Sequence, residues 1–209
     1  MKWTAVLALC VGMGSACPAH AQTPASPQTA KPLDGNWWRA ASKSERLGYL
    51  EGDNDCDSFE LGGRMLPANA IPSHEEFASK YYDADAAHVR TPVFDVLRIA
   101  DAEIAPAADK DADAMPEPHG DYDGLFWRDT RREERIGFIE GYLSCYARKN
   151  DHRRGTFSKS ADEYVKLLDG WYQLSEMERN VDPKIENAKV GEVIFKFRDR
   201  ERRTWLHPW

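Results

Sequence analysis

The chain has 209 residues, a formal net charge of -7 and 42% hydrophobic residues. This length is enough for one sizeable domain, or for two small units that share a core. The acidic balance argues against nucleic acid as a partner, because such binding depends on lysine and arginine side chains that neutralise phosphates. After the N-terminal region, no stretch approaches the roughly eighteen consecutive apolar residues that a membrane-spanning helix needs, so we expect no transmembrane segment.

The N-terminus has the pattern of a secretory signal peptide. Lys2 precedes an apolar run over residues 3–14, and small residues lead to a cleavage site after Ala21. We therefore predict a signal peptide over residues 1–21, a flexible segment over 22–32, and a periplasmic or secreted protein. A second interpretation makes Cys17 the lipid-modified N-terminus of a lipoprotein, although Gly14 stands three residues before it, where a bulky aliphatic residue is usual.

An internal repeat organises the rest of the chain. Gly35 to Cys56 aligns without gaps on Gly124 to Cys145, and nine of the 22 positions are identical. We assign repeat unit 1 to residues 33–100 and repeat unit 2 to residues 124–197. The segment between them, residues 101–123, is acidic and rich in Ala, Asp and Pro, which is typical of an exposed linker. Residues 198–209 form a basic and aromatic tail. The identical pairs are Gly35/Gly124, Trp38/Trp127, Arg39/Arg128, Glu45/Glu134, Arg46/Arg135, Gly48/Gly137, Glu51/Glu140, Gly52/Gly141 and Cys56/Cys145.

Each unit is predicted to contain three elements, and helices are favoured. In chain order, S/T-x-x-E signals typical of helix N-termini begin at Ser42, Ser73, Thr130 and Ser160. We match Ser73 with Ser160, and Pro92 with Pro183 as the start of the third element. Residues 190–197 are compatible with a helix or with a short strand. The sequence therefore predicts an all-α fold in which two tandem three-helix units pack as one pseudo-two-fold body.

A stripe without large side chains runs along the first long helix of both units. A glycine, a second glycine and a cysteine follow at i, i+4 and i+8, as Gly48, Gly52 and Cys56 and again as Gly137, Gly141 and Cys145. Glycine inside a helix costs about 1 kcal/mol relative to alanine, so its presence in both copies indicates a close approach to the backbone.

Two partners for this stripe are possible. We predict that the other copy approaches near an approximate two-fold axis and that Cys56 and Cys145 form a disulfide. They are the only cysteines after the signal peptide, and an exported chain meets an oxidising environment. In the alternative, each stripe receives its own unit's Trp38 or Trp127, and the cysteines stay free.

The tryptophans have two interpretations as well. Trp38 and Trp127 occupy equivalent places in the two units, where we expect core wedges rather than ligand platforms. Trp205 and Trp209 lie in the tail and are the candidates for contact with a ligand such as a glycan.

A calcium-like motif follows the first glycine stripe. Asp53, Asp55 and Asp57 resemble the start of an EF-hand loop, but Ser58 and Arg64 stand where glycine and a bidentate glutamate are needed. A looser cation site at the three aspartates is left as the alternative to a solvated helix end.

No complete catalytic set is recognisable either. The repeated glutamates are expected to cap helices and form salt bridges rather than to hold two metals, because those within one helix are six residues apart. They are Glu45, Glu51, Glu134 and Glu140. Glu51, Glu140 and His152 would be the least implausible participants in an enzyme. We expect a non-enzymatic protein with no catalytic residue, no metal and no cofactor.

In both units a tryptophan precedes a capped helix, and Tyr/Phe-x-x-Gly then leads toward a cysteine. This pattern, over Trp38 to Cys56 and Trp127 to Cys145, resembles the periplasmic immunity proteins that neutralise cell-wall amidase toxins of type VI secretion. The resemblance implies an exported binding protein with a protein partner in the envelope, an inhibitor of a peptidoglycan-active enzyme. This chain differs because it is a tandem and has one mature cysteine per unit, so no functional residue is carried over. The alternative function is a glycan-binding or cell-wall-binding module.

Overall fold

The structure is a computed structural model that describes residues 33–61, 66, 69–108, 122–149, 157–177 and 183–206. All regular elements in these ranges are helices, which confirms the all-α prediction. Unit 1 contains α1 (Gly35–Ala40), α2 (Lys43–Leu61), α3 (Ala70–Ala84), the 3-10 helix η1 (Ala86–Arg90) and α4 (Val93–Ala108). Unit 2 contains α5 (Gly124–Asp129), α6 (Arg132–Lys149), α7 (Ala161–Met177), α8 (Pro183–Glu186) and α9 (Val190–Leu206).

Several predicted boundaries are wrong. Each unit has five helical elements rather than three, because short helices carry Trp38 and Trp127 and the helices η1 and α8 precede the last long ones. The helix α4 continues to Ala108, into the segment predicted as linker, and α9 continues to Leu206, into the predicted tail. The third element is a helix in both units. The predicted signal peptide and N-terminal segment lie outside the described residues, as do 109–121 and 207–209.

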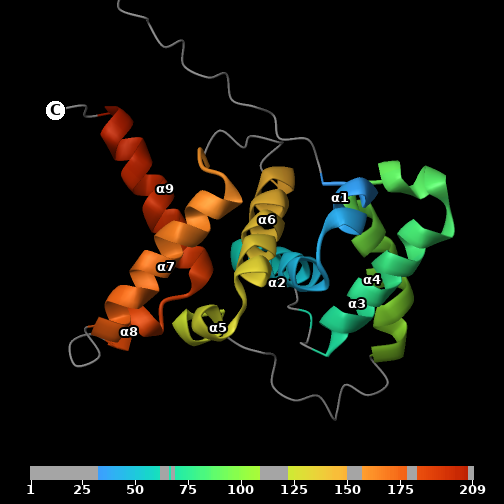
Figure 1. Cartoon of the computed structure of the whole chain (residues 1–209), viewed down its shortest axis with the longest axis horizontal. Helices are drawn as coiled ribbons and strands as arrows, with labels where there is room; N and C mark the ends of the chain where they lie inside the picture. Colours follow the sequence, from blue (N-terminus) through green and yellow to red (C-terminus); the bar gives the residue numbers. More distant parts are fainter. Residues whose placement is uncertain are drawn as a thin grey trace, which may run out of the picture.

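The helices α2 and α6 cross at the centre of the molecule (Figure 1). The other helices of unit 1 lie on one side of this crossing, and those of unit 2 lie on the other. Each side has its own hydrophobic cluster, one around Trp38 and Tyr82 and one around Trp127 and Tyr172. No helix of the described residues is long and apolar enough to cross a membrane.

The glycine stripes of α2 and α6 face each other at the crossing. A Cβ atom built on Gly48 would lie 2.0 Å from the carbonyl oxygen of Glu134, and one built on Gly52 would lie 1.9 Å from that of Phe138. The contacts are reciprocal, since Gly137 meets the Glu45 oxygen at 2.0 Å and Gly141 meets the Tyr49 oxygen, also at 2.0 Å. The partner of each stripe is therefore the other unit's helix, and the alternative that Trp38 and Trp127 fill the stripes is wrong. The pseudo-two-fold relation itself stays a prediction.

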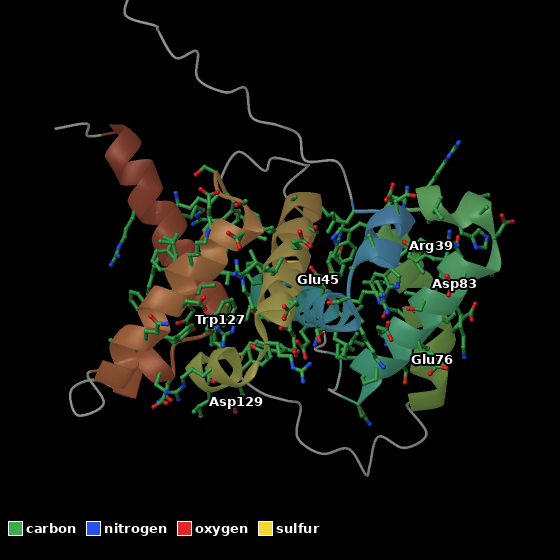
Figure 2. All side chains as sticks on the ribbon, viewed as in Figure 1. Arg39, Glu45, Glu76, Asp83, Trp127 and Asp129 are labelled. Atoms are coloured by element: carbon green, nitrogen blue, oxygen red, sulfur yellow. A yellow bond between two sulfur atoms is a disulfide. The ribbon has the colours of Figure 1, made fainter. Side chains whose placement is uncertain are left out.

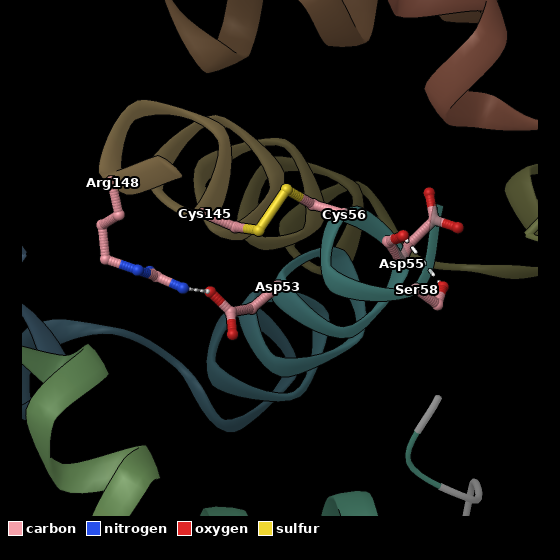
Figure 3. Close-up of a disulfide and its surroundings, with 6 residues drawn as sticks. All are labelled: Asp53, Asp55, Cys56, Ser58, Cys145 and Arg148. Atoms are coloured by element: carbon pink, nitrogen blue, oxygen red, sulfur yellow. Dashed lines mark hydrogen bonds and ion pairs between the residues drawn. A yellow bond between two sulfur atoms is a disulfide. The ribbon is translucent and has the colours of Figure 1, made fainter. Parts of the chain in front are cut away.

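A disulfide joins the two helices at one end of the stripes. Cys56 and Cys145 are bonded, with their Cα atoms 6.1 Å apart and both side chains fully buried (Figure 3). Cys56 belongs to the hydrophobic cluster of unit 2, so the bond ties α2 of unit 1 into the other unit's core.

Matched hydrogen bonds show which residues of the two units correspond. The Tyr82 hydroxyl donates to the Thr91 carbonyl oxygen, as the Tyr172 hydroxyl does to that of Ala188. The amide of Val93 donates to the Leu33 carbonyl oxygen, as the amide of Val190 does to that of Tyr122. Tyr82 thus corresponds to Tyr172, Thr91 to Ala188, and Val93 to Val190.

This register corrects two predicted matches. Ser160 caps α7 through reciprocal hydrogen bonds with Glu163, but Ser73 lies inside α3, which begins at Ala70. Ser160 corresponds to Ala70. Pro183 begins α8, the counterpart of η1, so it does not match Pro92. The predicted cap at Ser42 and Glu45 is present, whereas Thr130 ends α5 and donates to the Trp127 carbonyl oxygen.

A tryptophan, an arginine and an acid form the same core arrangement in both units. Trp38 and Trp127 are each only 1% exposed. The Arg135 guanidinium lies 5.6 Å from the Trp127 ring, and both side chains donate to Asp169 on α7 at 2.9 Å. Figure 2 shows Trp127 beside α5 and α7. In unit 1 Arg46 lies 5.8 Å from the Trp38 ring and pairs with Glu75 at 2.8 Å, while Ser79 accepts the indole N–H and donates to Glu75. These tryptophans are core wedges.

Candidate functional site

The candidate site is a cavity of about 560 Å³ in unit 1, lined by residues of α2, α3, α4 and α6 and by Leu66. This volume is in the range of small-molecule sites. Its apolar lining comes from Leu50, Leu66, Phe94 and Leu97. Its polar lining comes from Asp53, Asn54, Asp57, His74, Arg98, Asp101 and Arg148. The cavity therefore combines apolar walls with charged groups of both signs.

Asn54 fixes the one lining residue that lies outside a helix. Its side-chain amide donates to the Leu66 carbonyl oxygen at 3.1 Å and accepts from the Leu66 amide at 2.7 Å. Asn54 is only 5% exposed, and both its amide nitrogen and its amide oxygen are hydrogen-bonded, so its side chain is fixed. Leu66 is thereby held against the cavity.

Unit 2 contributes one side chain to this cavity of unit 1. Arg148 of α6 reaches α2, where its Nη2 atom lies 2.7 Å from Asp53 Oδ1, and both side chains are 18% exposed (Figure 3). Its guanidinium carbon lies 3.7 Å from the centre of the Phe94 ring. Asp53 and Arg148 each lie three residues from a cysteine of the disulfide. The bond between Cys56 and Cys145 therefore fixes the separation of α2 and α6 near this ion pair.

His74 is the most deeply buried ionisable group of the cavity, with 2% exposed. Its Nδ1 lies 2.8 Å from the Ala70 carbonyl oxygen, and its Nε2 lies 3.0 Å from Asp101 Oδ1. Both partners are acceptors, so these contacts favour the imidazolium, in which both ring nitrogens donate. Burial alone lowers the pKa of His74, but the hydrogen bonds to Asp101 and Ala70 outweigh it and the net pKa is raised.

The charges of the cavity balance. Asp53 pairs with Arg148 and Asp101 pairs with His74. The half-buried Asp57 adds a third carboxylate, and the exposed Arg98, 5.9 Å from the Phe94 ring, adds a third cation. A ligand therefore meets both signs of charge beside an aromatic ring.

The same place in unit 2 is filled. In the corrected register, Asp53 and Asp57 of unit 1 correspond to Tyr142 and Tyr146 of unit 2. His74 corresponds to Tyr164, and Arg98 corresponds to Phe195. Gly191 stands for Phe94, and a Cβ atom there would lie 2.8 Å from the Tyr142 hydroxyl oxygen, so this glycine gives room to the ring.

These rings pack against one another. Tyr146 lies 5.4 Å from Phe195 and 5.0 Å from Phe157, and Phe157 lies 6.0 Å from Tyr164, measured between ring centres. One copy of the repeat thus carries an aromatic core where the other carries a charged cavity.

The structure separates residues that the sequence placed together. Asp53 and Asp57 line the cavity, but Asp55 does not. Residues two apart on a helix point in different directions. Within the described ranges no group of three or more His, Cys, Asp or Glu side chains is arranged to hold a metal ion. His152 and Trp209 lie outside the described residues, and the side chain of Trp205 is not described.

Glu51 faces unit 2 and not the cavity. Burial, with the nearby charge of Glu134 from α6, raises the pKa of Glu51 to about 8. Burial also raises the pKa of Glu134. The buried Tyr122 hydroxyl lies near Glu51 as well. The charge that acts on Glu51 is thus that of Glu134 rather than that of its repeat counterpart Glu140.

Replacing Glu51 by glutamine should weaken a pH dependence of stability. A glutamate in the unfolded chain loses its proton near pH 4.5, whereas Glu51 in the folded protein keeps it to about pH 8. Between these values the folded state binds one more proton, so the free energy of unfolding falls as the pH rises. Urea unfolding at about pH 5 and about pH 8 should show a decline that is at least about 1 kcal/mol smaller in Glu51→Gln than in wild type. The exposed Glu133→Gln is the control, and equal declines in all three proteins would contradict the assignment.

Sequence reasoning missed most of the cavity. It considered Asp53 and Asp57 as part of a cation site but gave no binding role to His74, Phe94, Arg98, Asp101 or Arg148. Comparison of the repeats contained a signal, the replacement of charged residues by aromatic ones, but it is visible only in the corrected register.

No protein-family model, no curated protein and no solved structure matches this chain.

Proposed function

We propose that this protein is an exported, non-enzymatic binding protein of the cell envelope, and that its ligand occupies the cavity of unit 1. The observation that carries the proposal is the contrast between the repeats. Six ionisable side chains line the cavity of unit 1, whereas packed rings, with Arg198 beside Phe157 and Phe195, occupy the equivalent place in unit 2. Charged groups around a cavity are less stabilising than an aromatic core, so their presence in one copy favours a binding role.

The chemistry of the lining supports binding rather than catalysis. The residues that line the cavity include no serine, threonine or cysteine nucleophile. Both ring nitrogens of His74 already have acceptor partners within the protein, Ala70 and Asp101, so the ring is engaged in structural hydrogen bonds. The ion pairs fix side chains around a space that a ligand can occupy.

Export is supported by the disulfide, since such bonds persist in oxidising compartments, and by the predicted signal peptide. An immunity-like inhibitor would use the cavity to receive a side chain or chain end of a peptidoglycan-active enzyme. We do not extend the proposal to a glycan platform of exposed tryptophans. Its candidates, Trp205 and Trp209, supply no described side chain on which to build it.

The chain supplies the variant that tests this proposal. Asp57→Tyr with Arg98→Phe places in unit 1 the residues that unit 2 has at the matching positions, and should fill the cavity. After incubation with a low-molecular-weight envelope extract, native mass spectrometry should find a bound species on the wild-type protein and none on this filled variant. Arg98→Phe alone serves if the double variant does not fold.

Arg90→Ala is the control, because Arg90 is exposed at the end of η1 and does not line the cavity. It should retain the bound species. Equal retention by wild type and filled variant, or no retention by either, would refute the assignment of the cavity.

A further inference from the structure

We infer that the cavity of unit 1 takes a zwitterionic ligand, an amino acid or short peptide whose carboxylate lies against Arg148 and Arg98 and whose ammonium lies toward Asp57 and Asp101. This inference rests on the proposed function and names the ligand class of the same site. It follows from the placement of charge around the cavity and from one donor that the protein leaves unused.

The carboxylate end is indicated by Arg148. Its Nη2 atom donates to Asp53, whereas its Nη1 atom is buried and makes no direct hydrogen bond, with the Tyr49 hydroxyl near the guanidinium. A buried guanidinium donor without an acceptor is costly, and a ligand oxygen would remove that cost. The guanidinium is already held by Asp53 and by the Phe94 ring, so binding would not have to order it.

A second cation lies near the same ring. Arg98 is exposed on α4 and lies over Phe94, and no carboxylate of the described residues lies within ion-pair distance of it. Phe94 thus lies near both the half-buried Arg148, which Asp53 holds, and the exposed Arg98. Together they present donors for the two oxygens of one carboxylate.

The ammonium end is indicated by the carboxylates. Asp101 offers Oδ1 to His74 and is 53% exposed, so its other oxygen is open to a ligand. Asp57, one turn beyond Asp53 on α2, adds negative charge to the same cavity. A ligand ammonium beside these groups would gain charge-assisted hydrogen bonds.

The balance of charge selects the zwitterion. The lining holds three carboxylates, two guanidinium groups and His74, whose acceptor partners favour its charged form. A ligand with only a carboxylate would be repelled by Asp57 and Asp101. A ligand with only an ammonium would be repelled by Arg98 and Arg148. The leucines of the lining, Leu50, Leu66 and Leu97, leave an apolar region for a ligand side chain.

Charge-blocked forms of one dipeptide test the inference. Isothermal titration calorimetry of the disulfide-bonded protein would compare leucyl-leucine with N-acetyl-leucyl-leucine, which keeps only the carboxylate, and with leucyl-leucine amide, which keeps only the ammonium. We expect leucyl-leucine to bind at least about tenfold more tightly than either blocked form. Equal binding of a blocked form would overturn the inference, as would binding of an N-acetylglucosamine dimer without binding of leucyl-leucine.

Two variants locate the binding. Arg98→Gln and Asp57→Asn should each weaken leucyl-leucine about tenfold, and Arg90→Gln should leave its affinity unchanged. Unchanged affinity in both cavity variants would place the dipeptide elsewhere and refute the inference. If the filled variant loses the species retained from the envelope extract while wild type binds no leucyl-leucine, the ligand class is wrong and the proposed function stands. If the filled variant retains the same species as wild type, and wild type binds no leucyl-leucine, then the ligand class and the proposed function are both wrong.

Discussion

Gly52→Ala should destabilise the protein by about 3 kcal/mol or more, because it forces the central helices apart. The Cβ atom of alanine would lie 1.9 Å from the Phe138 carbonyl oxygen and 2.7 Å from its carbonyl carbon. These atoms belong to the backbone of α6, so no side-chain rotation relieves the overlap. The helices would have to separate or tilt, and the disulfide four residues away opposes both.

Gly170→Ala is the matched control. Gly170 lies within α7, and a Cβ atom there meets nothing within 4 Å. Alanine is favoured over glycine in a helix by about 1 kcal/mol, so this variant should be slightly more stable than wild type. Urea unfolding with the disulfide intact measures both variants. A Gly52→Ala protein as stable as Gly170→Ala would show that α2 and α6 do not approach at their backbones.

The central crossing could be predicted from the sequence because its cause is local. Gly48, Gly52 and Cys56 lie on one helical face, and the ungapped second copy repeats the face. A helix retains glycines at such a cost only where a backbone comes close. The spacing did not say which backbone, and the tertiary contacts settle it in favour of the other unit's helix.

The register of the later helices could not be predicted, because loops of different length separate them from the aligned part. The S/T-x-x-E pattern at Ser73 imitates a cap, but burial of Ile71 starts α3 earlier, at Ala70. The matching of Pro92 with Pro183 likewise paired two residues with similar local roles in different elements. Local signals mark where a helix can begin, and packing decides where it does.

The cavity was hidden for the same reason. The match of Ser73 with Ser160 aligned His74 with a small residue, Ala161. The correspondence of His74 with Tyr164 was therefore hidden. Arg148 lies beyond the aligned segment, and its contact with Asp53 spans 95 residues of sequence. Such a site depends on the crossing angle of two helices, which no local pattern carries.

Removal of the disulfide should lower the free energy of unfolding by about 2 to 4 kcal/mol. The bond between Cys56 and Cys145 closes a loop over a sequence separation of 89 residues, so its loss enlarges the conformational freedom of the unfolded chain. The double variant Cys56→Ala with Cys145→Ala, compared with oxidised wild type by urea unfolding, measures this. Thiol titration of the unreduced, denatured wild-type protein should find no free mature thiol, and two would refute the bond.

The disulfide and the glycine stripe should also be coupled. In the double variant Cys56→Ala with Cys145→Ala, α2 and α6 are no longer tied beside Gly52, so they can separate to admit a Cβ atom. Gly52→Ala should therefore be less destabilising there than in the oxidised protein, by an interaction energy of about 0.5 to 3 kcal/mol in a double-mutant cycle. Gly170→Ala, in α7, should show no such coupling. Additive effects of Gly52→Ala and disulfide removal would mean that the bond does not hold the helices at their close approach, even if it stabilises the fold.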